Sequence, residues 1–538
     1  MYQYSEQCPL PSKQHTRYIT LLPAQKSNDR LRCVLESTTL TDCPPFEAVS
    51  YVWGSDKMVS NIYCHDQAIP ITANLDDAIC INQVDPVEQG QQVAMMGQIY
   101  TTGYRTIVNL GPDSCKHAEA VASLLEEITR TDKRWNSYRN MVGHDWFSRT
   151  WTVQEAALGA EPYILWGSVE IPWLQFTCIN QWLLSKARHV WYHLKPWLND
   201  VHGRGFWEAE FPMPNFIETL ARAKTLHCKN EIDRIYAFLG SPKAVIGKNK
   251  EVVLVPDYET DYRKIYHDLA VSWLTKTQDL MLLSAIEHHE ESLRSPLPSW
   301  VPRWDVTLST NYYGLFSSGF DASAGFPITA PDLTTENELK VTGVVFDHII
   351  WRSAMLPKGD DWQVPVAGNT KELAAAWKHL AHFEAPRIRL PRVLAFVRTL
   401  CRQEYGNDSI DFHPDEAAFA LALCCQSSCF GDVDEPQLKK AASGGDADAF
   451  VTYAGIWAGQ RSVVLTEAGR YALAPALTRE GDECCIFTGM VVPVVVRPVD
   501  QLKLFQFIGE TFVLDVMHGE LYDEQSASGA KVQDMILI

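Results

Sequence analysis

The chain of 538 residues lacks the segments that mark secreted and membrane proteins. Its start, "MYQYSEQCPLPSKQHTRYITLLPAQ", has no charged region followed by an apolar stretch, so it does not read as a signal peptide. No run of about 18 apolar residues occurs, which is the length that a membrane-spanning helix needs. We therefore expect a cytoplasmic protein without a membrane span.

Positive charge is scarce in this chain. Lys and Arg number 47 against 66 Asp and Glu, which gives a formal net charge of −19, and no block of five basic residues occurs. Sequence-independent nucleic-acid binding and docking on anionic lipid both need a basic surface. We therefore expect no nucleic-acid and no membrane partner. A small-molecule ligand or substrate and a protein partner remain open.

Motifs of common enzyme classes are missing as well. There is no G-x-S-x-G elbow, no Walker loop, no G-x-G-x-x-G after a strand and no H-E-x-x-H. The 14 cysteines are scattered, and adjacent pairs such as Cys424–Cys425 do not have the C-x-x-C spacing that binds zinc. In "EHHEE" at 287–291 neighbouring side chains point apart, so we interpret it as a solvated loop. No metal and no cofactor is expected.

Strand and helix patterns alternate over residues 46–170, as is typical of an α/β unit. Shorter strand patterns precede them at 17–22 and 31–35, and "NIYCHDQAIPITANL" at 61–75 predicts two strands around a turn. The apolar run "AICI" at 78–81 predicts a strand buried inside the sheet. Residues spaced at helical intervals follow it, and "WFSRTWTVQEAALG" at 146–159 predicts a helix ended by glycine.

The rest of the chain is first helical and then rich in strands. Helical patterns dominate 174–290 and 370–450, and six short strand patterns fill 460–523. The predicted fold is an α/β N-terminal unit followed by a mainly helical region and a C-terminal β-rich module. The expected divisions are 1–45 (N-terminal strands), 46–175 (α/β domain), 176–300 (helical), 301–450 (mixed, mainly helical) and 451–538 (β-rich).

A set of motifs appears in a fixed order along the chain: "PFEAVSYVWGS", "ITANL", "DAICINQVDPVEQGQQVAMMGQIY" and "WFSRTWTVQEAAL". Together they resemble the fungal heterokaryon-incompatibility (HET) domain. "DRIYAFLG", "LPSWVPRWD" and the tail from "GRYALAP" onward look like the regions that follow it in long fungal members. The resemblance implies an intracellular fungal protein of a family that triggers growth arrest or cell death when incompatible nuclei share a cytoplasm. It also implies a distant similarity to Toll/interleukin-receptor domains, some of which cleave NAD.

The core of this signature is shortened. The family pattern has a helix and the apolar start of a strand between "NL" and "DAICINQ", whereas here only Asp76 and Asp77 stand between Leu75 and Ala78. Parallel strands need a crossover of about a dozen residues. Either the strands pair differently here or the gene model has lost a segment. The family's "VWLG" also reads "VNLG", with Asn109 in place of an aromatic residue.

Polar residues follow the expected "AICI" strand, at the sheet edge where α/β proteins bind ligands. Asn82 and Gln83 are binding candidates, and Asp85 and Glu88 are catalytic candidates. Asp85 before Pro86 also fits an N-cap, and Glu88 in the first turn also fits the helix dipole. Both alternatives remain open for each carboxylate.

Four further residues are binding candidates. Trp53 ends a strand, where it lines either the core or a pocket. Trp151 and Glu155 are four residues apart and share a helix face. Arg149 and Glu155 fit either a salt bridge or a ligand contact. We expect Trp53 to converge with Asn82, Gln83, Asp85 and Glu88 near one cleft, which Arg149 or Glu155 lines.

Two functions are consistent with the sequence. The first is a HET-family factor of non-self recognition and cell death. The second is an enzyme of fungal secondary metabolism that shapes an apolar substrate for cyclisation, as a cyclase or Diels-Alderase, through orientation in an aromatic pocket. The 17 tryptophans and the missing nucleophile motifs agree with the second. NAD cleavage rests on fold analogy alone.

Overall fold

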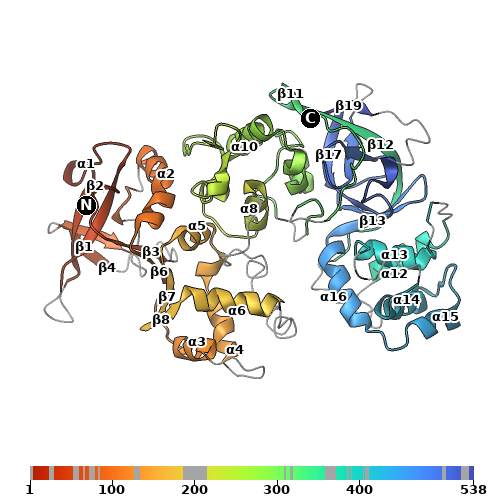
Figure 1. Cartoon of the computed structure of the whole chain (residues 1–538), viewed down its shortest axis with the longest axis horizontal. Helices are drawn as coiled ribbons and strands as arrows, with labels where there is room; N and C mark the ends of the chain where they lie inside the picture. Colours follow the sequence, from red (N-terminus) through yellow and green to blue (C-terminus); the bar gives the residue numbers. More distant parts are fainter. Residues whose placement is uncertain are drawn as a thin grey trace. The chain divides into compact units, whose positions relative to one another are not determined.

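The computed structural model divides into two compact units, Met1–Ile265 and Tyr266–Ile538, which are described separately (Figure 1). No helix in the described part of the chain is long and apolar enough to cross a bilayer. The structure describes residues 4–23, 30–51, 60–64, 67–71, 79–82, 85–126, 134–185, 215–307, 311–315, 319–357, 371–383, 387–388, 390–403, 405, 411–499, 504–522 and 532–538.

The first unit begins with a four-stranded sheet in the order β1-β2-β4-β5. β2 and β4 are parallel, and the two outer pairs are antiparallel. The strands predicted at 17–22, at 31–35 and within 61–75 are thereby confirmed. Their bounds are β1 His15–Leu21, β2 Arg32–Thr39, β4 Ser60–Cys64 and β5 Gln67–Ile71. One face buries apolar and cysteine side chains: Cys8, Cys33, Leu35, Ile62, Cys64, Ile69 and Ile79.

A second four-stranded sheet forms the α/β part, in the order β3-β6-β7-β8. β3, β6 and β7 are mutually parallel, so their carboxyl ends share one edge, and β7 and β8 form a hairpin. The long connection from β3 to β6 contains helix α2 (Pro86–Thr102). The strand bounds are β3 Glu47–Tyr51, β6 Arg105–Asn109, β7 Tyr163–Trp166 and β8 Val169–Pro172.

The prediction of an internal "AICI" strand is wrong for the residues that the structure describes. Ile79, Cys80 and Ile81 form a turn, and Ala78 lies outside the described residues. β6 is the parallel neighbour of β3, so the sheet has no position for a strand between them. Ile79 is 1% exposed because it packs into the core of the β1-β2-β4-β5 sheet. A short apolar run signals burial, and burial alone does not distinguish a strand from a turn.

Helix α5 (Thr150–Leu158) is shorter than the helix predicted over 146–159. Arg149 is extended, with φ −91° and ψ 145°, and separates α5 from the 3₁₀ turn η2 (Asp145–Ser148). Gly159 ends the helix as predicted, with φ −66°. Its role is close approach, because a Cβ at Gly159 would overlap the side chain of Thr106 on β6. Glycine therefore lets α5 lie directly against the sheet.

The remaining helices of the first unit follow the predicted regions, and α10 crosses the boundary between the units. The other elements are α1 Tyr4–Gln7, α3 His117–Glu126, α4 Trp135–Val142, α6 Trp173–Ser185, α8 Phe216–Ala223, α9 Asp233–Tyr236, η5 Pro242–Ala244, β9 Val245–Ile246, β10 Glu251–Val252 and α10 Tyr262–Thr277.

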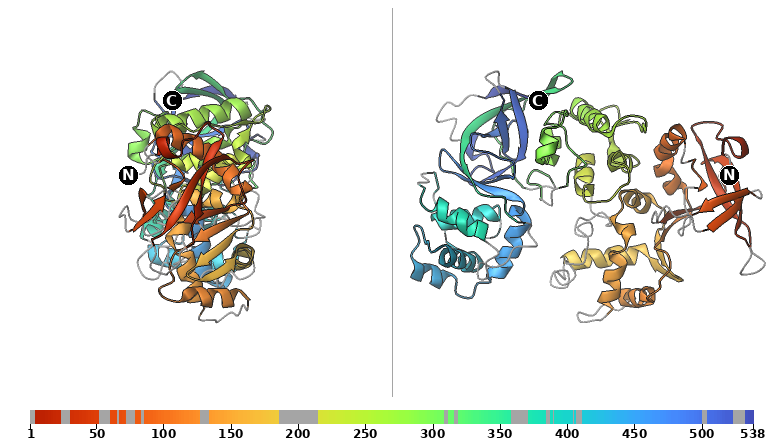
Figure 2. Two further views of the ribbon diagram at one scale, coloured as in Figure 1. Left: turned by 90° about the vertical axis from the view of Figure 1, so that its left-hand side faces the viewer. Right: turned by 180° about the vertical axis from the view of Figure 1, so that it is seen from behind.

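Five strands of the second unit close into a ring. β12 pairs with β15, the chain of pairs continues through β16 and β17 to β19, and β19 returns to β12. Figure 2 shows the green β12 beside the blue strands from the end of the chain. Closure removes exposed strand edges within the ring. The bounds are β12 Glu338–Arg352, β15 Glu483–Phe487, β16 Val494–Pro498, β17 Leu504–Glu510 and β19 Gln533–Leu537.

β12 continues past the ring and joins β13, β14 and β18, while β11 pairs with its first part. The predicted strands within 460–523 are confirmed. β12 lies in the stretch expected to be mixed and mainly helical, and the five-part division of the chain stays a prediction. The additional bounds are β11 Asp332–Thr335, β13 Arg461–Thr466, β14 Tyr471–Pro475 and β18 Phe512–Val513.

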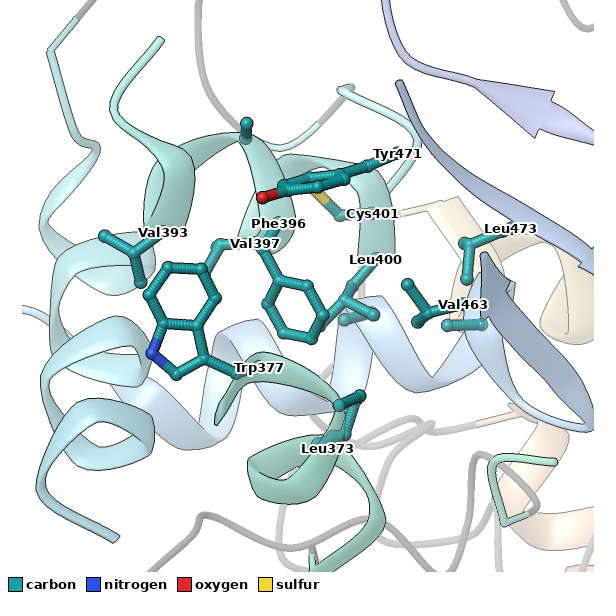
Figure 3. Packing of buried hydrophobic residues seen from close by; sticks show 14 of the residues in the cluster. Leu373, Trp377, Val393, Phe396, Val397, Leu400, Cys401, Val463, Tyr471 and Leu473 are labelled. Carbon is teal, nitrogen blue, oxygen red and sulfur yellow. The ribbon is translucent and has the colours of Figure 1, made fainter. Parts of the chain in front are cut away.

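A helical layer packs against β13 and β14. Trp377, Phe396 and Leu400 are fully buried and meet Val463 and Leu473 from the strands (Figure 3). The helices predicted over 370–450 are confirmed. Their bounds are α12 Lys371–Leu380, α13 Arg392–Leu400, α14 Pro414–Ser427, α15 Glu435–Ala441 and α16 Ala447–Ala458, and η6 Leu280–Ala285 and α11 Glu290–Leu293 precede them.

The interpretation of "EHHEE" as a solvated loop is wrong for its first two residues. Glu287 is 7% exposed and His288 is 6% exposed. The ring of His288 bonds the carbonyl of Ser299 at 3.0 Å and the hydroxyl of Ser292 at 3.3 Å, so burial leaves neither ring nitrogen without a partner. His289 caps α11 by accepting from the backbone N–H of Ser292.

Candidate functional site

Glu88 lies in a buried ion pair with Arg17 of β1. Arg17 Nη1 is 2.5 Å from Glu88 Oε1, and Nη2 is 3.0 Å from Oε2. The side chain of Arg17 is 1% exposed and that of Glu88 is 12% exposed. Arg17 also donates to the carbonyls of Cys8 and Cys80. The carboxylate therefore joins α2 to the N-terminal sheet.

The neighbouring candidates also make structural hydrogen bonds. The backbone N–H of Asn82 donates to Glu88 Oε1 at 2.7 Å. Asp85 Oδ1 accepts from the N–H groups of Val87 at 3.0 Å and Glu88 at 3.2 Å, which is N-cap geometry. Trp53 and Gln83 lie outside the described residues.

Glu155 lies in a second cluster, at the carboxyl end of β3. Its side chain is buried on α5, and the hydroxyl of Ser50 on β3 donates to Oε2. The indole of Trp146 donates to the Ser50 oxygen at 2.8 Å. Burial raises the pKa of Glu155, while the charge of Arg149 and the hydroxyl of Ser50 act in the opposite direction. Ser50 is itself fully buried, and its hydroxyl holds the carboxylate of Glu155 in position.

Asp233 is the second carboxylate of this cluster. Tyr258 donates its hydroxyl to Asp233 Oδ1 at 2.7 Å, and the indole of Trp151 donates to the same carboxylate. Burial raises the pKa of Asp233, and the two donors and the charge of Arg149 oppose that rise. Arg149 thus acts on the pKa of both Asp233 and Glu155.

The segment that supplies Asp233 runs along α5. Thr150 donates its N–H and its hydroxyl to the carbonyl of His227, at 3.0 and 3.1 Å. The N–H of Gly240 donates to Gln154 Oε1 at 3.0 Å. The motifs "WFSRTWTVQEAAL" and "DRIYAFLG" are therefore in contact, through Gln154 and Gly240. We name Ser50, Arg149, Trp151, Glu155, Asp233 and Tyr258 the α5 cluster.

The described contacts place the predicted site residues in two groups. Asn82, Asp85 and Glu88 gather around Arg17, whereas Arg149, Trp151 and Glu155 belong to the α5 cluster. Convergence of all candidates on one cleft stays a prediction. The sequence reasoning did not identify four contributors: Arg17, Ser50, Asp233 and Tyr258. Ser50 could have been recognised from the sequence, because it is a polar residue at a position of β3 that the alternation turns inward.

The α5 cluster holds two carboxylates in a largely buried setting beside one guanidinium. Burying a carboxylate costs free energy unless charge or hydrogen bonds compensate it. Groups with raised pKa values of this kind are frequent at functional sites, where they accept protons or bind cationic and hydrogen-bonding groups. The cluster also lies at the edge of the parallel strands, where α/β sheets bind ligands.

The variant Glu155→Gln should alter the pH dependence of stability. Because the folded-state pKa of Glu155 is raised, the folded chain holds this proton more tightly than the unfolded chain does. The resulting stabilisation is complete below the ordinary Glu pKa of about 4.3 and is lost as pH rises through the raised value. Urea unfolding measures this between about pH 4 and about pH 7. The free energy of unfolding of the variant should increase relative to that of wild type as pH rises. If the difference in free energy of unfolding between variant and wild type does not vary with pH, the raised pKa of Glu155 is contradicted.

Comparison with known proteins gives two family matches and one curated relative. Residues 76–155 match the heterokaryon incompatibility protein (HET) model, and residues 431–530 match the Het-6 beta-barrel domain. The chain is 22% identical to heterokaryon incompatibility protein 6, OR allele, of Neurospora crassa, over 95% of this chain and 94% of that protein. No solved structure matches. The HET resemblance recognised from the motifs is confirmed.

The matched regions can be placed on the described elements. The HET match begins just after Leu75 and ends at Glu155, so it contains α2 and most of α5 but leaves Ser50 and Asp233 outside. The barrel match contains β13 through β18. It leaves out β12 and β19, although these two strands close the ring.

Proposed function

We propose that this chain, which carries a HET domain and a Het-6 barrel domain, acts inside a fungal cell in non-self recognition and arrests growth. The similarity to a heterokaryon incompatibility protein over nearly the whole of both chains is the observation that carries this proposal. The two family matches, at residues 76–155 and 431–530, agree with this similarity. A protein partner belongs to the proposal, because recognition of another nucleus requires contact with one of its products.

The α5 cluster is the site that we assign to this activity. Its support is the pair of carboxylates with raised pKa values, placed around Arg149 at the carboxyl edge of the parallel strands. Glu155 is the residue we propose to act on a ligand. We assign Glu88 and Asp85 to positioning instead, because the first holds Arg17 and the second caps α2.

The cyclase alternative has little support in the described residues. A substrate-shaping enzyme needs an apolar pocket of roughly 300 Å³ or more. One cavity among the described residues of the second unit measures about 20 Å³ and has Glu287, Arg461 and Glu510 in its wall. This cavity is too small to enclose such a substrate.

Inducible expression of the full chain in a filamentous fungus tests the proposal. We expect radial growth to stop or slow sharply on induction, because the proposed activity is toxic to the hypha that carries it. A strain with the same promoter and an unrelated globular protein is the control for expression load. Normal growth at a chain abundance equal to that control, together with an altered metabolite profile after deletion of the gene, would contradict the proposal and support biosynthesis.

A further inference from the structure

A small cavity lies in the second unit where several segments meet. Its wall includes Glu287 after η6, Tyr312, Arg461 at the start of β13 and Glu510 at the end of β17. The cavity measures about 20 Å³, which is room for about one water molecule. Neither family match assigns a ligand to this place.

Two carboxylates face this cavity. Glu510 accepts from the N–H groups of Tyr313 and Gly314, the second at 2.8 Å, and from Arg461 Nη2 at 3.3 Å. Glu287 Oε2 accepts from the hydroxyl of Tyr312 at 3.0 Å. Burial raises the pKa of Glu510, and the charge of Glu287 raises it further against the opposing charge of Arg461.

Arg461 supplies the observation that points to a ligand. Its side chain is buried, Nη1 donates to the carbonyl of Glu510 at 3.0 Å, and Nη2 donates to the carbonyl of Asn311 at 3.0 Å. The guanidinium carbon lies 3.9 Å from the centre of the Tyr313 ring. Nε has no acceptor among the residues that the structure describes. A buried N–H group without an acceptor is destabilising, so an acceptor is expected there.

We propose that this cavity binds one neutral oxygen ligand, a water molecule or a single hydroxyl group, that accepts from Arg461 Nε and donates to Glu287 or Glu510. A cation is disfavoured by the guanidinium, and an anion is disfavoured by the two carboxylates. Water and hydroxyl groups have both a donor and an acceptor, as the site requires. The ligand would link the "EHHEE" segment to the β-barrel module.

A crystal structure of the full chain at a resolution that shows ordered water tests this site. In crystals grown without polyols we expect an ordered oxygen about 2.7–3.2 Å from Arg461 Nε and from one carboxylate oxygen. Soaking with glycerol distinguishes the sources, because a bound hydroxyl shows connected carbon density and a bound water does not. Absence of an ordered oxygen under both conditions overturns the proposal.

A pair of lysine variants tests the role of the Nε donor. Arg461→Lys keeps the positive charge but removes Nε–H, so the ordered oxygen should disappear or move. Arg352→Lys is the matched control, because Arg352 is exposed and donates to the carbonyl of Ala476 at the same cavity. The oxygen should stay in place in this control. An oxygen that keeps its position in Arg461→Lys contradicts the assignment. If that variant does not fold, the wild-type structure alone decides.

Discussion

Replacing Arg17 with alanine should destabilise the first unit by about 3–5 kcal/mol, the loss expected when one partner of a buried ion pair is removed. The variant leaves the carboxylate of Glu88 without its two guanidinium bonds, and it removes the Arg17 donor from the carbonyls of Cys8 and Cys80. Denaturant unfolding of the full chain, followed by tryptophan fluorescence and by proteolysis of the N-terminal region, measures the loss.

Two matched variants make this test specific. Arg105→Ala removes an ion pair with Glu47 whose side chains are 35% and 43% exposed, so the loss of stability should be much smaller than for Arg17→Ala. Arg17→Met combined with Glu88→Leu removes both buried charges and should recover part of the lost stability. An Arg17→Ala variant as stable as Arg105→Ala would show that the buried pair does not hold α2 to the sheet.

The regular elements could be predicted because their signals are local. The short strand pattern "RYITLL", the helical spacing after Pro86 and the glycine at 159 each indicate structure within a few residues. The prediction of a strand at "AICI" failed, because its apolar residues indicate burial but not the sheet against which they pack. The helix over 146–159 was predicted too long, because nothing local marks the extended backbone of Arg149.

The partners of the site residues could not be predicted, because they come from distant parts of the chain. Glu88 and Arg17 are 71 positions apart, and Ser50 and Glu155 are 105 positions apart. Local chemistry correctly gave N-capping as one of the two roles considered for Asp85. For Glu88 the alternatives were the helix dipole and a ligand, and the structure adds a third role, the ion pair.

The barrel shows the same division between local and distant information. Its strands within 460–523 were recognised one by one, but ring closure depends on β12 and β19, which lie on either side of that stretch. β12 enters the barrel from a region whose pattern is mostly helical. Pairing between strands so far apart has no signature within either strand.

Glu155→Gln should abolish growth arrest while leaving the fold intact. Glutamine has nearly the same shape and keeps an oxygen that accepts from the Ser50 hydroxyl, but it removes the charge that faces Arg149. A buried carboxylate is less stable there than a neutral amide, so stability gives no reason for the charge. Its proposed role on a ligand does require the charge. Glu88→Gln is the matched comparison, and it should reduce arrest only in proportion to the folded protein that it loses.

The most direct measurement is the radial growth rate of isogenic fungal strains that express wild type, Glu155→Gln or Glu88→Gln. Immunoblots and thermal unfolding of the purified chains establish that abundance and folding of the first two are equal. The account predicts that the wild-type chain arrests growth and that the Glu155→Gln strain grows like the uninduced strain. Equal arrest by wild type and Glu155→Gln would contradict the assignment of the α5 cluster, and free growth of all three strains would contradict the proposed function itself.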